Sequence, residues 1–333
     1  MNWQQLPDPI KQEALTQYRK NRSLNNPALA DIATDHNINI GTLLRRLQEM
    51  DRSERANYLA LTEGIQLPTQ SERQWNDCLV IEDENAIVIS DIESPDADLV
   101  WLETVILMGI KHNIRRLIIL GDTSAGDQPG LATHLLTWFE SGQVDFKSSI
   151  GMLRRMIQIF LIFFDEIDII SGNHDQRIAK ATGGQIDLGT FLEDFGTRVR
   201  FSRYRRMYMR TSRGLIAMYH QANFSQNGVA LAQKMYDAEP GLNRQKPYAV
   251  IITHIHHWGC GKSKDNLAEV YSLGCSRDPN LTQYINETPS TFAKWSQSLI
   301  IIEDGYLRNL ERDSTNWKKE LGEYAEKARI CAA

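Results

Sequence analysis

Six short runs of β-branched and aliphatic residues constrain the fold of this 333-residue chain more than any other feature. They occupy residues 86–90, 116–120, 166–170, 215–219, 249–252 and 298–302, and stretches of helical character separate them. Strands this apolar are usually buried on both faces, as in a sheet that helices cover. The pattern therefore predicts an α/β fold with a layered β-sandwich or sheet core flanked by helices.

Residues 1–60 are predicted to form a small all-α domain before that core. Its second and third helices are separated by a polar break at residues 35–41. This arrangement resembles a helix-turn-helix DNA reader, whose second helix would offer four side chains to a DNA groove: Asn39, Thr42, Arg45 and Arg46. A helical hairpin that packs on a neighbour or mediates assembly has the same pattern, so both interpretations stay open.

The rest of the chain divides by composition. Residues 61–76 contain Gly64, Pro68 and many polar side chains, which indicates a linker. Residues 77–312 hold all six apolar runs and are predicted to form one catalytic domain. Residues 313–333 are predicted to form a C-terminal helix exposed to solvent.

Net charge and cysteine content limit the binding partners and the cellular compartment that we expect for the protein. The net charge of −5 argues against a uniformly basic protein, although a local basic patch for DNA remains compatible with it. The four cysteines are isolated from one another, which predicts free thiols in a reducing compartment. We find no secretory signal and no apolar run near the roughly 20 residues that a bilayer span needs. We therefore expect a cytoplasmic protein without a membrane partner.

Polar side chains follow five of the predicted strands, at the point where each strand ends. They are Asp91 and Glu93, then Asp122, then Asn173, His174 and Asp175, then His220, and finally His254 and His256. In an open α/β sheet, the carboxyl ends of the strands form the edge where ligands bind. Carboxylate, amide and imidazole donors suit Mn, Mg, Fe or Zn, and their number exceeds the four ligands of a closed zinc site. The sequence therefore predicts two divalent metal ions at this edge.

The order of these motifs, D-x-x, GD, GNHD, H and H-x-H, resembles the calcineurin-like metallophosphoesterase superfamily. Within it, the chain is most similar to phage and bacterial members related to DNA-processing phosphoesterases. The resemblance implies that Asp91 and His256 bind a first metal ion and that Asp122 bridges to a second. It implies the ligands of the second ion: Asn173, His220 and His254. It also implies that His174 lies near the leaving group as a proton donor or a positive stabiliser, and that Asp175 orients it.

Position 93 departs from the family pattern, which usually has D-x-H at the first strand. Glu93 stands where the histidine is expected. If Glu93 binds metal, three carboxylates face two ions, which favours Mn or Mg over Zn. If Glu93 points away, the first ion loses a ligand.

The predicted function is hydrolysis of phosphodiester bonds by a hydroxide that two metal ions, Mn²⁺ above all, activate. No covalent intermediate is expected, and a DNA-directed nuclease is the preferred interpretation. Two alternatives stay open. One is a phosphomonoesterase or nucleotide hydrolase, and the other is a DNA-binding regulator with a degenerate phosphoesterase site.

An arginine-rich segment bears on the substrate. Residues 198–213 contain seven arginines with aromatic residues between them, a composition that suits phosphates and bases. From this segment we select Arg203, Arg205 and Arg206 as candidate contacts to nucleic acid. Arg177, just after the GNHD motif, is a fourth candidate, and it would otherwise brace a loop. A solvated hairpin whose arginines pair with carboxylates explains the segment equally well. The sequence leaves open whether the chain forms a homo-oligomer.

Overall fold

The computed structural model describes residues 3–21, 25–61, 78–125, 146–223, 225, 227–242, 245–281 and 295–331, with the backbone alone for residues 55–61. The chain divides into two compact units, Met1–Gln74 and Trp75–Ala333, which are treated separately here. Apart from Leu61, the predicted linker lies outside the described residues.

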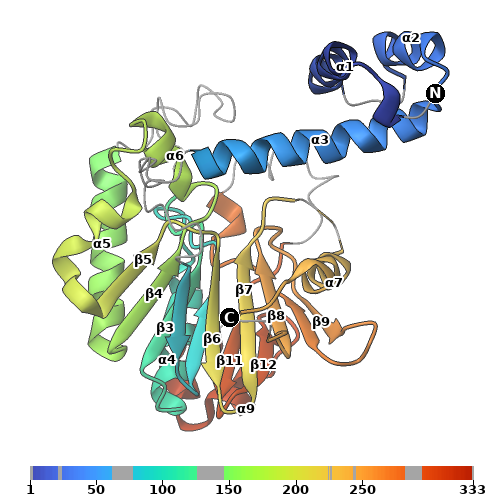
Figure 1. The fold of residues 1–333 in the computed structure, drawn as a ribbon. Helices are drawn as coiled ribbons and strands as arrows, with labels where there is room; N and C mark the ends of the chain where they lie inside the picture. The colour runs from blue at the N-terminus through green and yellow to red at the C-terminus, as the bar shows by residue number, and fades with distance from the viewer. Residues whose placement is uncertain are drawn as a thin grey trace. The chain divides into compact units, whose positions relative to one another are not determined.

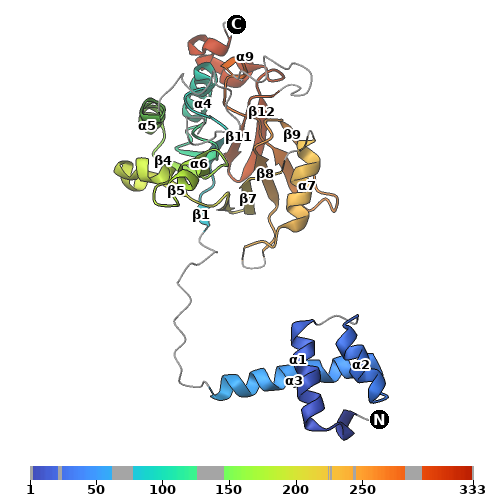
Figure 2. The same ribbon diagram turned by 90° about the horizontal axis from the view of Figure 1, so that it is seen from above.

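The N-terminal unit is helical, as predicted (Figure 2). A 3₁₀ turn at Trp3–Gln5 precedes α1 (Asp8–Lys20), α2 (Pro27–Asp35) and α3 (Ile40–Leu61). A core of fully buried leucines holds the three helices together: Leu15, Leu29, Leu43 and Leu47. Asn37 has a φ of +50° in the turn before α3, a conformation that asparagine tolerates. The three helices establish a compact helical unit, while a role as a DNA reader stays a prediction.

Within the residues that the structure describes, the strands form two sheets of six (Figure 1). In one sheet the order is β12 (Tyr306–Glu311), β11 (Ser298–Glu303), β2 (Ala86–Ile89), β3 (Arg116–Leu120), β4 (Glu166–Ile170) and β5 (Val199–Ser202). In the other it is β1 (Leu79–Glu82), β6 (Arg206–Thr211), β7 (Gly214–His220), β8 (Ala249–Thr253), β10 (Glu269–Ser272) and β9 (Gly259–Lys262). The six predicted runs are therefore confirmed as strands, and they are divided between two sheets, as in the predicted layered β-sandwich.

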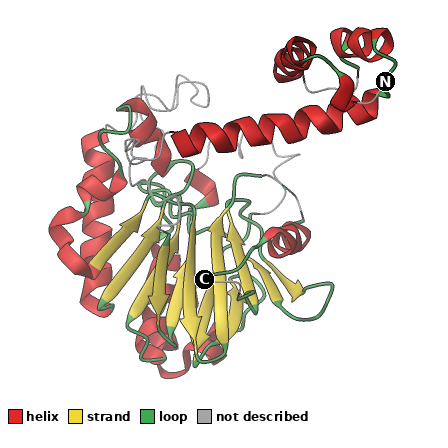
Figure 3. Ribbon diagram, in the orientation of Figure 1, coloured by secondary structure: helices red, strands yellow, loops and turns green. Residues whose placement is uncertain are grey.

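The sheets pack face to face, and helices cover their outer faces (Figure 3). Residues alternate between the two sides of each strand. In β3, Ile118 and Leu120 contribute to the core between the sheets, whereas Leu117 and Ile119 contribute to the core under the helices. A strand that packs against the other sheet on one face and against helices on the other is apolar on both faces. This explains why the sequence shows continuous rather than alternating apolar runs.

The covering helices come from both halves of the catalytic unit. The first sheet is covered by α4 (Leu99–Lys111), α5 (Phe146–Phe163) and the C-terminal segment, and the second by α7 (Gly228–Ala238). The short helix α6 (Asp175–Ala181) follows β4, and the 3₁₀ turns Leu188–Phe191 and Glu193–Arg198 lead into β5. A further 3₁₀ turn occupies Pro279–Leu281. Within the described ranges, no helix has both the length and the apolar character required to span a bilayer.

The C-terminal segment differs from its prediction as an exposed helix. It forms a short helix, α9 (Trp317–Leu321), followed by 3₁₀ turns at Gly322–Lys327 and Arg329–Cys331. Trp317 is buried, and its ring meets that of Trp101 on α4 edge-on at 5.5 Å between centroids. Burial of these apolar side chains ties the segment to the core.

Candidate metal centre

Five of the predicted metal ligands have a left-handed backbone. Their φ angles are +49° at Asp91, +47° at Glu93, +46° at Asp122, +90° at His254 and +58° at His256. For residues other than glycine this conformation is sparsely populated and costs about 1–3 kcal/mol each. The surrounding structure must hold these residues in place, and such a concentration of strained ligands is typical of functional sites.

Hydrogen bonds between loops place the first two motifs side by side. Beyond the ends of β2 and β3, the N–H of Asp91 donates to the carbonyl of Gly121 at 3.1 Å. The N–H of Glu93 donates to the carbonyl of Asp122 at 2.8 Å. These bonds continue the pairing of the two parallel strands, so the carboxylates of both loops face the same space.

Two glycines allow the loops to approach closely. A Cβ on Gly121, whose φ is +81°, would lie 2.5 Å from Nδ1 of His220. A Cβ on Gly172 would lie 2.0 Å from Oδ1 of Asp122. Neither distance is compatible with a side chain, which gives a physical reason for the glycines of the GD and GNHD motifs.

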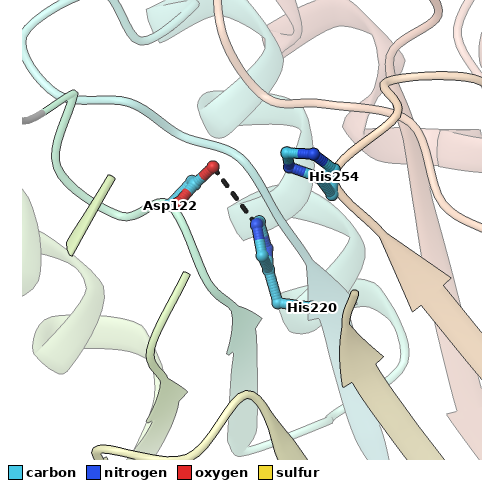
Figure 4. A group of neighbouring side chains, drawn as sticks. All are labelled: Asp122, His220 and His254. Atoms are coloured by element: carbon cyan, nitrogen blue, oxygen red, sulfur yellow. Dashed lines mark ion pairs between the residues drawn. The ribbon is translucent and has the colours of Figure 1, made fainter. Parts of the chain in front are cut away.

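Asp122, Asn173, His220 and His254 meet between the two sheets (Figure 4 shows three of them). Nε2 of His220 lies 3.2 Å from Oδ2 of Asp122 and 2.9 Å from Oδ1 of Asn173. Donor atoms of Asp122, His220 and His254 all lie within 4.8 Å of one another. The carbonyl of Leu120, 2.9 Å from Nδ1 of His220, fixes the ring so that Nε2 faces this group. This set contains the side chains predicted to bind the second ion.

Asp91, Glu93 and His256, the side chains predicted for the first ion, also lie together. Nε2 of His256 lies 3.2 Å from Oδ1 of Asp91 and 3.4 Å from Oε1 of Glu93. One donor atom from each of the three residues lies within 4.8 Å of the others. The ring of Trp295 packs edge-on against that of His256 at 4.1 Å between centroids. Glu93 therefore points toward the predicted site rather than away from it.

The two positions are adjacent. Glu93, Asp122 and His174 form a third group whose donor atoms also lie within 4.8 Å of one another. Asp122 and Glu93 thus each belong to two groups, and together they connect the first position to the second. This placement is compatible with the predicted bridging role of Asp122.

Burial and charge oppose each other at these side chains. Burial alone would raise the pKa of Asp91 and Asp122, but the neighbouring imidazoles lower both pKa values below their usual range. Burial lowers the pKa of His220, yet the charge of Asp122 outweighs it and raises the pKa to about 9. Burial and the charge of His220 lower the pKa of His254 to about 4. The imidazoles of His256 and His220 thus favour the anionic form of Asp91, and those of His220 and His174 favour the anionic form of Asp122.

The donor set fits divalent cations. Asp91, Glu93 and Asp122 are at most 1% exposed, and burying three anions so close together is costly unless cations balance them. Oxygen and imidazole nitrogen donors are the ligands that Mn, Mg, Fe and Zn accept. The site therefore has the donor atoms and the excess negative charge that two divalent ions require.

Asp175 connects the loops of the site. Its carboxylate accepts hydrogen bonds from the backbone N–H groups of Gly172 at 2.8 Å, Ser124 at 3.0 Å and Thr123 at 3.3 Å. Burial and the charge of Asp122 raise its pKa to about 6. Asp175 therefore ties the loops after β3 and β4 together, and its predicted role in orienting His174 stays a prediction.

His174 is held by other groups. Its ring Nδ1 contacts the carbonyl of Ala125, and Nη2 of Arg177 lies 3.3 Å from its Nε2. Nε2 is also 4.0 Å from Oδ2 of Asp122. Arg177 is only 7% exposed and donates to the carbonyl of Ala125 at 3.0 Å, so it braces the loop beside His174. The predicted contact of Arg177 with nucleic acid is not favoured by this burial.

Arg277 belongs to the site although the sequence analysis did not select it. Its side chain is 4% exposed and forms an ion pair with Glu93, while its Nη2 lies 2.6 Å from Oδ2 of Asp96. It lies in the loop after β10, a strand parallel to β8 that was not predicted. Residues 270–273 are mostly apolar, and the polar side chains that follow them are the sequence signal that could have identified this loop.

The arginine-rich segment spans β5, the following loop and the β6–β7 hairpin. Some of its arginines pair with carboxylates, the contact that the hairpin interpretation expects: Arg200 binds Asp168 and Arg210 binds Glu82, whereas Arg198 binds backbone carbonyls. Arg203 and Arg205 lie in the loop at the C-terminal end of β5. Arg203 pairs with Asp187 while its side chain stays 72% exposed, and Arg205 donates to Gln176 at 2.7 Å. Arg206 begins β6, in register with Tyr219.

The candidate DNA contacts of the N-terminal unit have mixed environments. Asn39 accepts hydrogen bonds from the N–H groups of Gly41 and Thr42, at 3.0 and 3.2 Å, and so caps α3. Arg46 pairs with Glu49 at 2.7 Å. Arg45 is exposed and Thr42 is partly exposed. The cap gives Asn39 a structural role. Contact of the four residues with DNA stays a prediction.

Comparisons with known proteins concern the fold only. Neither the family models nor the curated protein sequences with which the chain was compared match it. Among solved structures, a metallophosphoesterase from Sphaerobacter thermophilus is similar at 13% identity and a TM-score of 0.37, covering 75% of this chain and 99% of its own. The E. coli phosphoesterase Yfce is similar at 12% identity and a TM-score of 0.37, covering 68% of this chain and 98% of its own.

Proposed function

We propose that the chain is a metal-dependent phosphoesterase that hydrolyses phosphodiester bonds. The observation that carries the proposal is the convergence of seven oxygen and nitrogen donors from five strand ends on two adjacent positions, which Asp122 and Glu93 connect through a third group with His174. A buried pair of positions with excess negative charge suits two divalent ions, and paired ions suit displacement at phosphorus. We propose Mn²⁺ or Mg²⁺, because carboxylates form much of the donor set.

Each position has its own residues. Asp91, Glu93 and His256 would hold the first ion, and Asn173, His220 and His254 the second, with Asp122 between them. Bound divalent ions would supply an activated water and neutralise the charge of the phosphoryl oxygens. Nε2 of His174 lies 4.0 Å from Asp122, where it would donate a proton to the departing oxygen.

The preferred substrate class is DNA, which makes the proposed enzyme a nuclease. Supporting observations lie beside α6, where a cavity of about 420 Å³ is lined by residues that include Asp175, Lys180, Phe201 and Arg203. Two cationic side chains suit phosphates, and the aromatic ring of Phe201 suits a base. The N-terminal unit would bind the duplex through Arg45 and Arg46.

A nucleotide or a small phosphomonoester is the second candidate substrate. The cavity beside α6 favours it, because its volume falls within the range of pockets that bind small molecules. The third candidate is a DNA-binding regulator without catalytic activity, for which the substitution of Glu93 for the expected histidine is the motivation.

One set of assays separates the three candidates. The full chain is incubated with bis-p-nitrophenyl phosphate, p-nitrophenyl phosphate and plasmid DNA in Mn²⁺ or Mg²⁺. Cleavage of the diester and of DNA supports the nuclease. Turnover of the monoester alone, without DNA binding, contradicts it. No turnover with either ion contradicts the enzyme and supports the regulator.

Salt dependence tests the role of the N-terminal unit. Replacing Arg45 and Arg46 with alanine should weaken binding to duplex DNA and reduce the slope of log K against log salt by about 1 for each lost phosphate contact. Arg52→Ala is the matched control, because Arg52 is also exposed on α3. Equal slopes for the double variant and the wild type would rule out contacts through these two arginines.

A further inference from the structure

Glu93 uses its two carboxylate oxygens for different partners. Oε2 forms the ion pair with Nη1 of Arg277, whereas Oε1 lies 3.4 Å from Nε2 of His256. Oε1 is thus the oxygen on the side of the first ion position. An arginine on the far oxygen restricts the rotation of the carboxylate and directs the near oxygen to the site.

Arg277 is built into the fold at this point. Ala97 and Arg277 form an isolated antiparallel bridge, and the carbonyl of Arg277 accepts from Nε2 of Gln297 at 3.0 Å. Ser276 donates from its N–H to the carbonyl of Asp91 at 3.0 Å, so the loop carrying the arginine is bonded directly to the loop carrying the ligands. With only 4% of its side chain exposed, Arg277 is shielded from solvent and from an incoming substrate.

Charge explains why such an arginine is needed. The family pattern has a neutral histidine where this chain has Glu93, so the glutamate adds one buried negative charge beside Asp91 and Asp122. Arg277 contributes one buried positive charge at hydrogen-bonding distance from it. A buried ion pair is tolerated when both partners are present, but removing one partner leaves an uncompensated charge.

We propose that Glu93 and Arg277 act as one unit at the first ion position. Arg277 binds one oxygen of Glu93 and leaves the other as a metal ligand, and the pair as a whole is neutral, like the histidine it replaces. Arg277 is therefore a positioning residue, and Glu93 binds the first ion only when Arg277 holds its other oxygen. This inference rests on the proposed function only in requiring that ions bind.

A double-substitution cycle read by metal binding tests the proposal. Isothermal titration with Mn²⁺ measures the number of bound ions and the dissociation constant of each, without reference to activity. Glu93→His in the wild-type background leaves the buried Arg277 with Asp96 as its remaining carboxylate partner and places the guanidinium beside the new imidazole, and we expect the weaker-bound ion to lose about a hundredfold in affinity. In the Arg277→Gln background, the same Glu93→His substitution should cost less than tenfold, since no buried cation then lies beside the imidazole.

Arg116→Gln supplies the matched background control. Arg116 is also a largely buried arginine among carboxylates, pairing with Asp83 and Asp168, but it begins β3 and therefore lies at the end of the strand away from the site. Glu93→His should cost the same hundredfold in this background as in the wild type. Thermal unfolding of each metal-free variant identifies any protein that does not fold, and Glu93→Gln replaces Glu93→His if the latter fails.

The outcomes separate the inference from the proposed function. Equal losses in the wild-type and Arg277→Gln backgrounds overturn the coupling of Glu93 and Arg277 while leaving the two-ion centre intact. Unchanged ion binding by Glu93→His in the wild-type background overturns it as well. If the wild-type chain binds no Mn²⁺ at all, the proposed function fails first.

Discussion

The two ion positions use similar side chains but are held by different physical means. At the second position, backbone geometry dominates. Gly121 and Gly172 allow the loops to touch, and the carbonyl of Leu120 fixes the ring of His220. At the first position, charge dominates, because Glu93 is held by Arg277 from a loop that is distant in the sequence. A centre of this kind can therefore exchange a neutral ligand for an anionic one at the position where a buried cation compensates for it.

Asp122→Asn is expected to have the largest effect, because Asp122 lies between the two positions. Replacing the carboxylate with an amide removes the shared anionic ligand, and we expect kcat/KM to fall about 10⁴-fold. Elemental analysis should show loss of metal from both positions. Asp304→Asn, at an exposed turn, is the control. Retention of two ions with wild-type activity would contradict a shared role for Asp122.

His254→Ala should remove one ion and leave the other. His254 contributes to the second position, so we expect one bound ion to remain and kcat/KM to fall about 10³-fold. Calorimetric titration with Mn²⁺ measures the stoichiometry. His112→Ala is the control, because His112 caps the end of α4 and pairs with Glu303. Loss of both ions would show that the positions do not fill independently.

His174→Ala distinguishes metal binding from proton donation. We expect both ions to bind as in the wild type, while hydrolysis of an unactivated phosphodiester falls about 10²-fold. With a p-nitrophenolate leaving group, which needs little protonation, the loss should be less than tenfold. Equal losses for both substrates would contradict the proposed role of His174 as a proton donor.

Asp175→Ala tests whether hydrogen bonds to the backbone hold the loops of the second position in place. The substitution leaves three buried N–H groups without their acceptor, and we expect about 3 kcal/mol loss in the free energy of unfolding. Urea denaturation of the metal-free protein measures it. Asp175→Asn keeps one acceptor oxygen and should lose about 1 kcal/mol. A loss below 0.5 kcal/mol for Asp175→Ala, within the range of an ordinary surface substitution, would contradict the structural role.

Local sequence was sufficient for the six apolar strands and for the polar side chains that meet at the ends of five of them. Burial on both faces makes runs such as residues 116–120 continuously apolar, and a polar residue directly after such a run lies at a strand end. The same reasoning failed at the C-terminus, because the burial of Trp317 depends on a partner, Trp101, that is more than two hundred positions away in the chain. It did not identify the three backbone partners of Asp175, which belong to loops that come together only on folding.

The sequence by itself determined that a layered α/β core would present carboxylates, an amide and imidazoles at its strand ends, because these properties follow from the order of residues within short segments. Only the tertiary structure decided that two sheets supply them, that Glu93 and Asp122 are neighbours, and that Arg277 faces Glu93 across 184 positions of the chain. The physical reason is that charge compensation acts through space. A buried cation has its effect at a distance of a few ångströms, wherever in the chain it comes from.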